Sequence, residues 1–349
     1  MKDTLLFIPV KLDDTRAIKR LLDSLKHNGY FRDSSFGIVV VDDGCPNPEV
    51  KRLCSEYPVT YLRTKGVGKM AALNYAVRRT SSKYVAFTDQ DNIVVSANWL
   101  QTLKLNFTSK DIGYVSGKVT LFKSESEAQK RWEKKGALND ILPALKSGVS
   151  LQRRMTYQRS IHLRSKLRSV LECCYKGNEK IVFGKEFFEK FRLRGVPVNL
   201  CTVGSNHIMP RKILEEIGFH DERFGPGAFV DGAGGDLDIT YKILKRGYTV
   251  IYDPKAVIGH EHPTTFSSLR NKMFSYGISD TAIHLKFLFE FGDIRSFFQV
   301  FYRIGQNTLR FLRSLTGSYP LPPHVALASI LGNLVGPIKY LELRLKKIH

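Results

Sequence analysis

The most informative stretch of this chain is Tyr84-Val85-Ala86-Phe87-Thr88-Asp89-Gln90-Asp91. It is a short apolar run with the character of a buried strand, and it ends in two carboxylates one residue apart. Side chains at i and i+2 of an extended backbone point to the same side, so Asp89 and Asp91 can converge on one point. Converging carboxylates cost free energy unless positive charge lies between them, and a hard divalent cation such as Mg²⁺ or Mn²⁺ prefers such oxygen ligands. The alternative is a turn, because Asp and Asn residues such as Asp91 and Asn92 commonly end strands.

The sequence on either side of this stretch alternates between strand and helix patterns. Apolar runs at residues 5–10, 36–41 and 59–62 predict three more strands, and the stretches between them carry apolar residues at helical spacing. This alternation predicts an α/β fold with a mainly parallel central sheet that is covered by helices on both faces. Ligands of such sheets bind outside the carboxyl ends of the strands, where Asp42 and Asp43 are also expected.

Two blocks of short motifs share their order and spacing with a known family. The first block contains residues 7–10 (Phe-Ile-Pro-Val), 40–44 (Val-Val-Asp-Asp-Gly), 68–74 (Gly-Lys-Met-Ala-Ala-Leu-Asn), 87–91 (Phe-Thr-Asp-Gln-Asp) and 99–100 (Trp-Leu). The second contains residues 203–207 (Val-Gly-Ser-Asn-His), 217–222 (Ile-Gly-Phe-His-Asp-Glu), 235–239 (Gly-Asp-Leu-Asp-Ile), 246–248 (Arg-Gly-Tyr) and 253–260 (Asp-Pro-Lys-Ala-Val-Ile-Gly-His). Over residues 1–120 and about 200–262 the chain resembles the inverting glycosyltransferases of family two, which have the GT-A fold.

The resemblance implies a site for a nucleotide-sugar donor and a divalent cation. The residues expected to contact the donor are Pro9, Asp42, Asp43, Lys69, Asn74 and Asp89. The Asp-x-Asp motif, Asp89 and Asp91, is expected to hold Mn²⁺ or Mg²⁺ together with His260, which matches a family histidine. His262 lies two residues further on, and for it a role as ligand and a structural role are weighted equally.

The resemblance also implies a catalytic base. Inverting transfer is a single displacement, in which a carboxylate accepts the proton of the acceptor hydroxyl. In the family this is the Asp of a Glu-Asp pair; here Gly235 replaces the Glu, and Asp236 is retained as the expected base. Asp238 is the second candidate. The structural alternative for Asp236 is a capping role at the start of a helix over residues 237–246.

The predicted organisation is a GT-A domain over residues 1–265 followed by a helical C-terminal region over 266–349. Residues 1–120 form the nucleotide-sugar-binding half of the domain, and residues 121–265 form the acceptor half. The predicted function is metal-dependent, inverting transfer of a hexosyl group, from a UDP-sugar in preference to other donors. The acceptor is a hydroxyl of a glycan or a lipid-linked molecule in polysaccharide or cell-envelope synthesis.

Two alternative functions are considered from the sequence. Gly235 motivates the first, a non-catalytic carbohydrate-binding or scaffold protein that retains the fold. The second is a sugar nucleotidyltransferase, which normally has a glycine-rich, Arg-containing loop after the first strand. Residues 10–14 (Val-Lys-Leu-Asp-Asp) are unlike that loop.

Composition adds information about partners and location. The chain has 349 residues, a formal net charge of +21 and five cysteines without metal-ligand spacing, which predicts reduced thiols in a cytoplasmic protein. No apolar run has the roughly 20 residues of a membrane span. Basic residues crowd the segment 130–168, where a phosphate-bearing acceptor would suit the charge. Nucleic acid is the weakest candidate partner, because no nucleic-acid-binding motif accompanies the charge.

The C-terminal region points to one further partner. Residues 282–315 are dense in Phe and Leu with arginines interspersed, and residues 325–336 are apolar and small. Aromatic and basic residues on one amphipathic helix suit an anionic membrane surface, which would make the protein peripheral at the inner face of the membrane. Packing against the catalytic domain or a second subunit is the equally weighted alternative.

Overall fold

The structure is a computed structural model that describes residues 2–11, 15–122, 125–135, 175–176, 180–190 and 204–346. The basic residues between 153 and 168 and the cysteines Cys173, Cys174 and Cys201, which the sequence analysis considered, lie outside these ranges.

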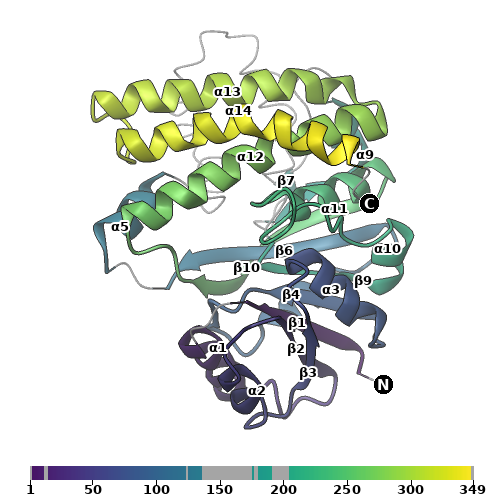
Figure 1. Ribbon diagram of the computed structural model, residues 1–349. Helices are drawn as coiled ribbons and strands as arrows, with labels where there is room; N and C mark the ends of the chain where they lie inside the picture. Colours follow the sequence, from purple (N-terminus) through teal and green to yellow (C-terminus); the bar gives the residue numbers. More distant parts are fainter. Residues whose placement is uncertain are drawn as a thin grey trace.

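One mixed sheet of ten strands runs through the described part of the chain, in the order β3-β2-β1-β4-β9-β6-β10-β8-β7, with β5 paired to β10 (Figure 1). The strands are β1 (Thr4–Val10), β2 (Phe36–Asp43), β3 (Thr60–Thr64), β4 (Tyr84–Thr88), β5 (Asn92–Val94), β6 (Ile112–Leu121), β7 (Tyr175–Lys176), β8 (Lys180–Phe183), β9 (Asn206–Pro210) and β10 (Thr249–His260).

The N-terminal half of the sheet is parallel, as its apolar strands predict. Strand β1 pairs in parallel with β2 on one side and with β4 on the other, so the strand order reverses at β1. The carboxyl ends of β1, β2 and β4 therefore surround the point where ligands of such sheets bind. Beyond β4 the sheet is mixed, because β9 is antiparallel to both β4 and β6.

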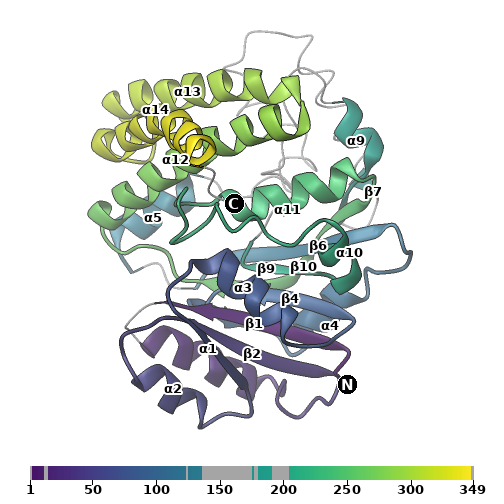
Figure 2. The same ribbon diagram turned by 45° about the vertical axis from the view of Figure 1, so that its right-hand side comes forward.

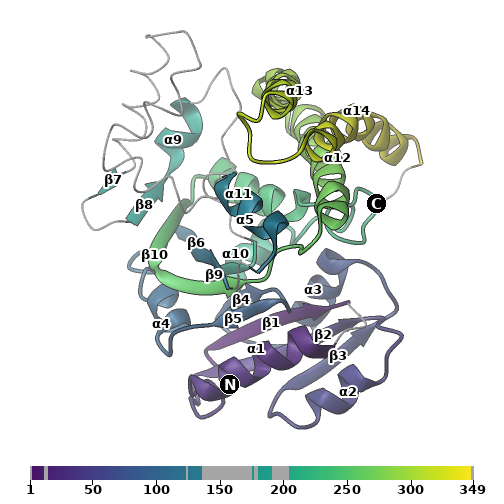
Figure 3. The ribbon, with the colours of Figure 1, turned by 90° about the vertical axis from the view of Figure 1, so that its left-hand side faces the viewer.

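Helices cover both faces of this sheet (Figures 2 and 3). They are α1 (Thr15–His27), α2 (Glu49–Cys54), α3 (Lys69–Arg78), α4 (Trp99–Lys104), α5 (Glu127–Lys134), α9 (Lys185–Lys190), α10 (Arg211–Glu216) and α11 (Gly234–Lys245). Because β1 side chains alternate between faces, Leu6 and Ile8 join the core under α1, while Leu5 and Phe7 join the core under α3 and α11. The expected α/β fold with both faces covered is confirmed.

Three long helices follow the sheet, namely α12 (Phe266–Phe291), α13 (Ile294–Leu315) and α14 (Pro323–Leu345). Helix α12 begins next to the predicted boundary at residue 265, yet Ile278, Ile283 and Phe287 lie in the same apolar core as α3 and α11. The helical region therefore shares its core with the sheet. Within the described part of the chain, no helix is both long and apolar enough to cross a bilayer.

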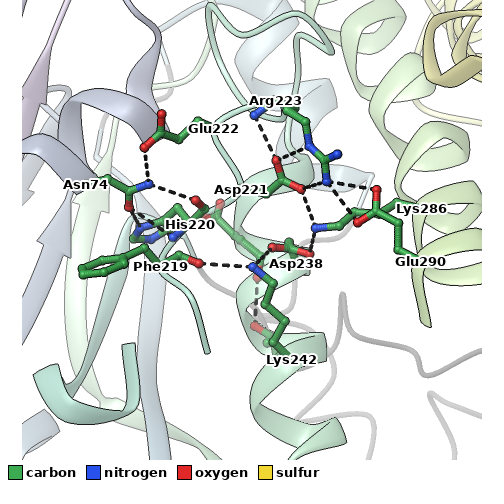
Figure 4. A network of polar contacts seen from close by, with 12 residues as sticks. Asn74, Phe219, His220, Asp221, Glu222, Arg223, Asp238, Lys242, Lys286 and Glu290 are labelled. Atoms are coloured by element: carbon green, nitrogen blue, oxygen red, sulfur yellow. Dashed lines mark hydrogen bonds and ion pairs between the residues drawn. The ribbon is translucent and has the colours of Figure 1, made fainter. Parts of the chain in front are cut away.

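A buried ionic network joins α12 to the sheet domain (Figure 4). Lys286 of α12 is 2% exposed and forms ion pairs with Asp221, at 2.6 Å, and with Asp238 of α11. Asp238 is also paired with Lys242 at 2.7 Å. Taking such charges out of water is costly, so the buried network is stable only while each charge keeps its partners.

Removal of the Lys286 ammonium should therefore destabilise the protein. We expect Lys286→Met to lower the free energy of unfolding by about 3–5 kcal/mol in denaturant titration, because it removes the buried cation that Asp221 and Asp238 share and leaves them with Arg223 and Lys242 alone. Lys19→Met is the control: its pair with Asp23 is about half exposed on both sides, and its loss should cost about 1 kcal/mol or less. Equal effects of the two substitutions would contradict the stabilising role of the network.

Candidate active site

The expected cation ligands come together at the carboxyl end of β4. Asp89 and Asp91 follow that strand directly, and the short strand β5 then pairs with the end of β10 in a register that sets Asn92 opposite His260. The backbone N–H of Glu261 donates to the carbonyl of Asp91 at 3.1 Å, which fixes the two segments. One ligand atom each from Asp89, Asp91 and His260 lie within 4.8 Å of one another.

The donor set fits a divalent cation. The Nδ1 atom of His260 is buried without a hydrogen-bond partner, and it lies 3.8 Å from an Oδ2 atom of Asp91. Burial raises the pKa of the Asp91 carboxyl, with the nearby Asp89 acting in the same direction and His260 against it. An unsatisfied ring nitrogen facing carboxylates in this way is the arrangement that a bound Mn²⁺ or Mg²⁺ would complete.

Lys69 balances part of the negative charge in this cluster. It is the first residue of α3, and its ammonium group lies 2.5 Å from Asp89 Oδ1. Burial would lower the pKa of Lys69, but Asp89 and Asp236 outweigh it and raise that pKa. The same ion pair holds the pKa of Asp89 below its ordinary value against the effect of burial. Lys69 therefore links the cluster electrostatically to Asp236.

Asp236 lies in the first turn of α11 but does not cap that helix. The N-cap residue is Ala233, and no side chain caps the helix there. Burial raises the pKa of Asp236 to about 6; Lys69 opposes this shift and Asp89 adds to it. Among the described residues the carboxylate has no hydrogen bond or ion pair, which leaves it available as a proton acceptor.

Two glycines close to Asp236, namely Gly204 and Gly235, leave room for neighbouring side chains. A Cβ at Gly204 would collide with the Asp236 carboxylate, so the carboxylate lies directly over the Gly204 backbone. A Cβ at Gly235 would lie 2.5 Å from Cε of Met70. The Met70 side chain thus fills the space into which a side chain at residue 235 would point.

Asp42 and Asp43 are buried and hold the loop that leads into α3. Asp42 accepts hydrogen bonds from the Cys45 backbone N–H at 2.7 Å and from Tyr61. Asp43 accepts from the backbone N–H groups of Val67, at 2.7 Å, and Gly68, at 2.9 Å. Both carboxylates therefore stabilise the turns that follow β2 and β3, at the carboxyl ends of these strands.

Asn74, a predicted donor contact, and Asp238, the second candidate for the base, bind neighbouring parts of the protein. The Asn74 side chain donates at 2.9 Å to the carbonyl of His220 and to Glu222, and so anchors that loop to α3 (Figure 4). Asp238 is 0% exposed and forms ion pairs with Lys286 and Lys242. The structure does not bring either side chain to the cation cluster. Pro9 lies near the carboxyl end of β1, opposite Val41.

The sequence pointed to His262 and to the basic segment 130–168, but not to the group of basic and aromatic side chains that lies beside the cluster. The His262 ring lies 4.8 Å from that of His260, and 5.7 Å from the ring of Trp132 on α5. The Trp132 ring is flanked by Lys135 Nζ at 4.0 Å and Lys272 Nζ at 5.7 Å. Their sequence signal is weak, because the three residues come from two helices more than 130 positions apart.

The charges in this group are incompletely balanced. Burial lowers the pKa of Lys135 to about 7, and Arg310 and Lys272 add to the effect. Burial and the neighbouring His260 lower the pKa of His262 to about 3, so this ring is neutral. Within the described ranges neither Lys135 nor Lys272 has a carboxylate at ion-pair distance. Burial would lower the pKa of Lys272, but Tyr276, Asp91 and Asp89 raise it. The group therefore offers the charged Lys272 to an anion, together with Lys135, which an anion would keep protonated.

A separate cavity of about 480 Å³ lies on the outer side of α3. Its basic lining residues are Arg63, Lys65, Arg78 and Arg79. None of the three cluster residues lines it, so we place the candidate chemistry at the cation cluster, where the geometry converges, and not in this cavity.

Known proteins resemble this chain in sequence and in fold. The model of Glycosyl transferase family 2 matches residues 6–218. The mannosyltransferase PcManGT from Pyrobaculum calidifontis, solved in complex with GDP-Man and Mn²⁺, has a TM-score of 0.51 at 15% identity, covering 99% of this chain and 88% of its own. At this identity the likeness shows the fold alone.

A glucosyl-3-phosphoglycerate synthase from Mycobacterium tuberculosis, solved with Mn²⁺, UDP and glucosyl-3-phosphoglycerate, has a TM-score of 0.43 at 14% identity, covering 78% of each chain. No curated protein sequence matches the chain significantly. Because the family model covers more than half of the chain, this protein belongs to glycosyl transferase family 2 and is a glycosyltransferase with the GT-A fold.

Proposed function

We propose that the protein transfers a sugar, with inversion and with the help of Mn²⁺ or Mg²⁺, from a nucleoside-diphosphate sugar to an acceptor hydroxyl. UDP is the proposed nucleotide, and a glycan or lipid-linked molecule of polysaccharide or cell-envelope synthesis is the proposed acceptor. The observation that carries the proposal is the convergence of Asp89, Asp91 and His260 next to Asp236.

Each residue has a proposed role in a single displacement. Pro9, Asp42, Asp43 and Lys69 border the nucleotide, and Asp89, Asp91 and His260 hold the cation. The bound cation would neutralise charge on the diphosphate leaving group. The acceptor oxygen attacks the anomeric carbon, the bond from that carbon to the phosphate oxygen breaks, and Asp236 accepts the hydroxyl proton. We leave Asn74 and Asp238 out of this set, because their polar atoms are engaged in the framework.

The acceptor is proposed to carry a phosphate group. Support comes from Lys135 and Lys272, whose side chains flank Trp132, the ring beside His262. A phosphate would pair with both and offset the burial and the repulsion from Arg310 and Lys272 that lower the pKa of Lys135. We also propose a cytoplasmic location, which suits the buried, reduced thiols of Cys45 and Cys54.

Replacement of the proposed base tests the enzyme against the non-catalytic alternative. Asp236→Asn should reduce sugar release from a nucleotide-sugar by about 10²–10⁴-fold, because the amide cannot accept the proton. The nucleotide with Mn²⁺ should still raise the melting temperature of this variant as it does for the wild type. Asp111→Asn, at an exposed position, is the control. If Asp236→Asn turns over donor normally, Asp236 is not the base; if the wild type shows no turnover with any donor, the non-catalytic alternative gains support.

Removal of the cation or of one ligand tests the metal site. A chelator should abolish sugar release, and added Mn²⁺ should restore it. Asp91→Asn and His260→Ala should each raise the Mn²⁺ concentration needed for half-maximal nucleotide binding by roughly 10–100-fold or more, measured by calorimetric titration. Tight nucleotide binding that is independent of the cation in the wild type would contradict this role.

Neutralising Lys272 tests the phosphate-bearing acceptor. In a panel of acceptors with and without a phosphate group, Lys272→Met should raise KM for the phosphorylated acceptors by about 10–100-fold, since a charge-assisted contact contributes about 1.5–3 kcal/mol. KM for the donor should not change. Arg270→Met, at an exposed position two residues earlier on α12, should have no effect. A rise in donor KM alone would assign Lys272 to the donor diphosphate instead.

A further inference from the structure

Helix α13 has an inverted distribution of polarity. Its buried residues are mostly polar, namely Ser296, Gln299, Val300, Asn307 and Ser314. Its large apolar side chains are 37–61% exposed, namely Ile294, Phe297, Phe298, Phe301, Tyr302, Leu309, Leu312 and Leu315. A helix on the surface of a water-soluble domain normally turns its apolar stripe to the core. The outward stripe of α13 therefore needs an apolar environment outside this chain.

Helix α14 repeats the inversion. The residues it buries are mostly small, including Ala326, Ala328, Ser329, Gly332, Asn333 and Gly336. Its outward stripe consists of Leu327, Leu331, Leu334, Ile338, Leu341 and Leu345, which are 38–83% exposed. These residues recur at alternating intervals of four and three, so they lie along one side of the helix. We call the exposed stripes of α13 and α14 together the outer face.

Small and polar residues make the contacts between these helices. A Cβ at Gly332 or Gly336 would collide with backbone carbonyls of α12, so the two backbones touch. Asn333 Nδ2 donates to the carbonyl of Gly277 at 2.9 Å, and Asn307 Nδ2 donates to Asn333 Oδ1 at 2.6 Å. Close backbone packing at small residues with polar side chains between helices is typical of helices in contact with lipid. Large side chains such as Val325, Tyr340 and Leu343 are also buried, but those of the outer face take no part in these contacts.

The position of the outer face suits a flat surface. Helices α13 and α14 lie side by side at the end of the molecule away from β1–β3, with α12 between them and the sheet (Figures 1 and 3). Because each helix is apolar on one side only and packs against α12 with the other, both would lie in the plane of that surface.

Charge favours a lipid surface over a second copy of the chain. Residues 294–345 contain six basic residues, Arg295, Arg303, Arg310, Arg313, Lys339 and Arg344, and one acidic residue, Glu342. Arg295 is paired with Asp293 and Lys339 with Glu342, so the net positive charge comes from the other four arginines. Two copies facing each other would bring like charges together, whereas anionic headgroups attract them. The spacing on α14 also suits a coiled coil, but a second copy paired along α14 alone would leave the α13 stripe exposed.

We propose that the outer face of α13 and α14 docks in the plane of an anionic lipid bilayer, with its Phe and Leu side chains at the boundary between headgroups and acyl chains. Docking goes beyond the proposed transfer reaction and does not depend on it. Docking would fix the orientation of the sheet, and of the cation cluster on it, relative to the bilayer surface.

Flotation of the full chain with vesicles tests the proposal. The wild type should float with vesicles of phosphatidylcholine and phosphatidylglycerol and much less with phosphatidylcholine alone. Phe298→Glu with Phe301→Glu, and separately Leu331→Glu with Leu334→Glu, should weaken binding by at least about 10-fold. Leu105→Glu, at a 66% exposed apolar residue far from these helices in sequence, is the control and should float like the wild type.

The folding of the variants and the rival occupant are tested in the same series. Because the substituted residues are exposed, melting temperatures and the shift produced by nucleotide with Mn²⁺ should match the wild type. The proposal is overturned if the wild type does not float with the anionic vesicles, or if the double variants float undiminished. Equal flotation on phosphatidylcholine alone overturns the anionic requirement. A wild-type dimer without lipid that both double variants convert to monomers assigns the outer face to a second copy instead.

Discussion

The repulsion between the carboxylates of Asp89 and Asp91 is the constraint on which the candidate site depends. The fold holds both side chains at the end of β4, and the pairing of β5 with β10 adds the His260 ring beside them. Lys69 compensates only part of this negative charge, since its ion pair is with Asp89 and burial still raises the pKa of Asp91. The remaining imbalance is what a divalent cation with a diphosphate would satisfy. The same lysine acts on Asp236, so cation binding and proton acceptance share one electrostatic environment.

The sequence was sufficient for those parts of the fold that rest on residues close together along the chain. The apolar strand before Asp89 and the parallel half of the sheet follow from local patterns, and the structure contains them. The role of the Asp-x-Asp motif stays a prediction. Asn74 and Asp238 show the limit of such patterns. Their positions match the family motifs, but their partners, His220 and Lys286, lie 146 and 48 residues away. Trp132, Lys135 and Lys272 show the opposite case, because no motif marks them and only the packing of α5 near α12 brings them together.

Gly235 illustrates how a departure from a family pattern can be absorbed by packing. The missing Glu raised the alternative of a protein without catalysis. In the structure the space beside Gly235 is filled by Met70, the residue after Lys69, so the loss of one side chain is matched by a large apolar neighbour. With Gly235 in place of the family's Glu, there is one carboxylate fewer in a region that already contains Asp89, Asp91 and Asp236. It leaves the Asp236 carboxylate in place over Gly204, and a more apolar surrounding favours the raised pKa that a general base needs.

The C-terminal helices show why sequence alone left two alternatives open there. Apolar density along residues 282–315 is compatible with packing on the enzyme and with binding to a surface, since either requires apolar side chains. In the structure the three helices differ in how far their apolar side chains are exposed. The apolar residues of α12, such as Ile283 and Phe287, are buried in the core shared with the sheet, whereas those of α13 and much of α14 face outward. Helix α12 can thus transmit a fixed orientation from α13 and α14 to the site, because its Lys286 is tied to Asp221 and Asp238 and its Lys272 lies beside Trp132. One rigid helix therefore connects the surface that faces outward to the residues that surround the cation cluster.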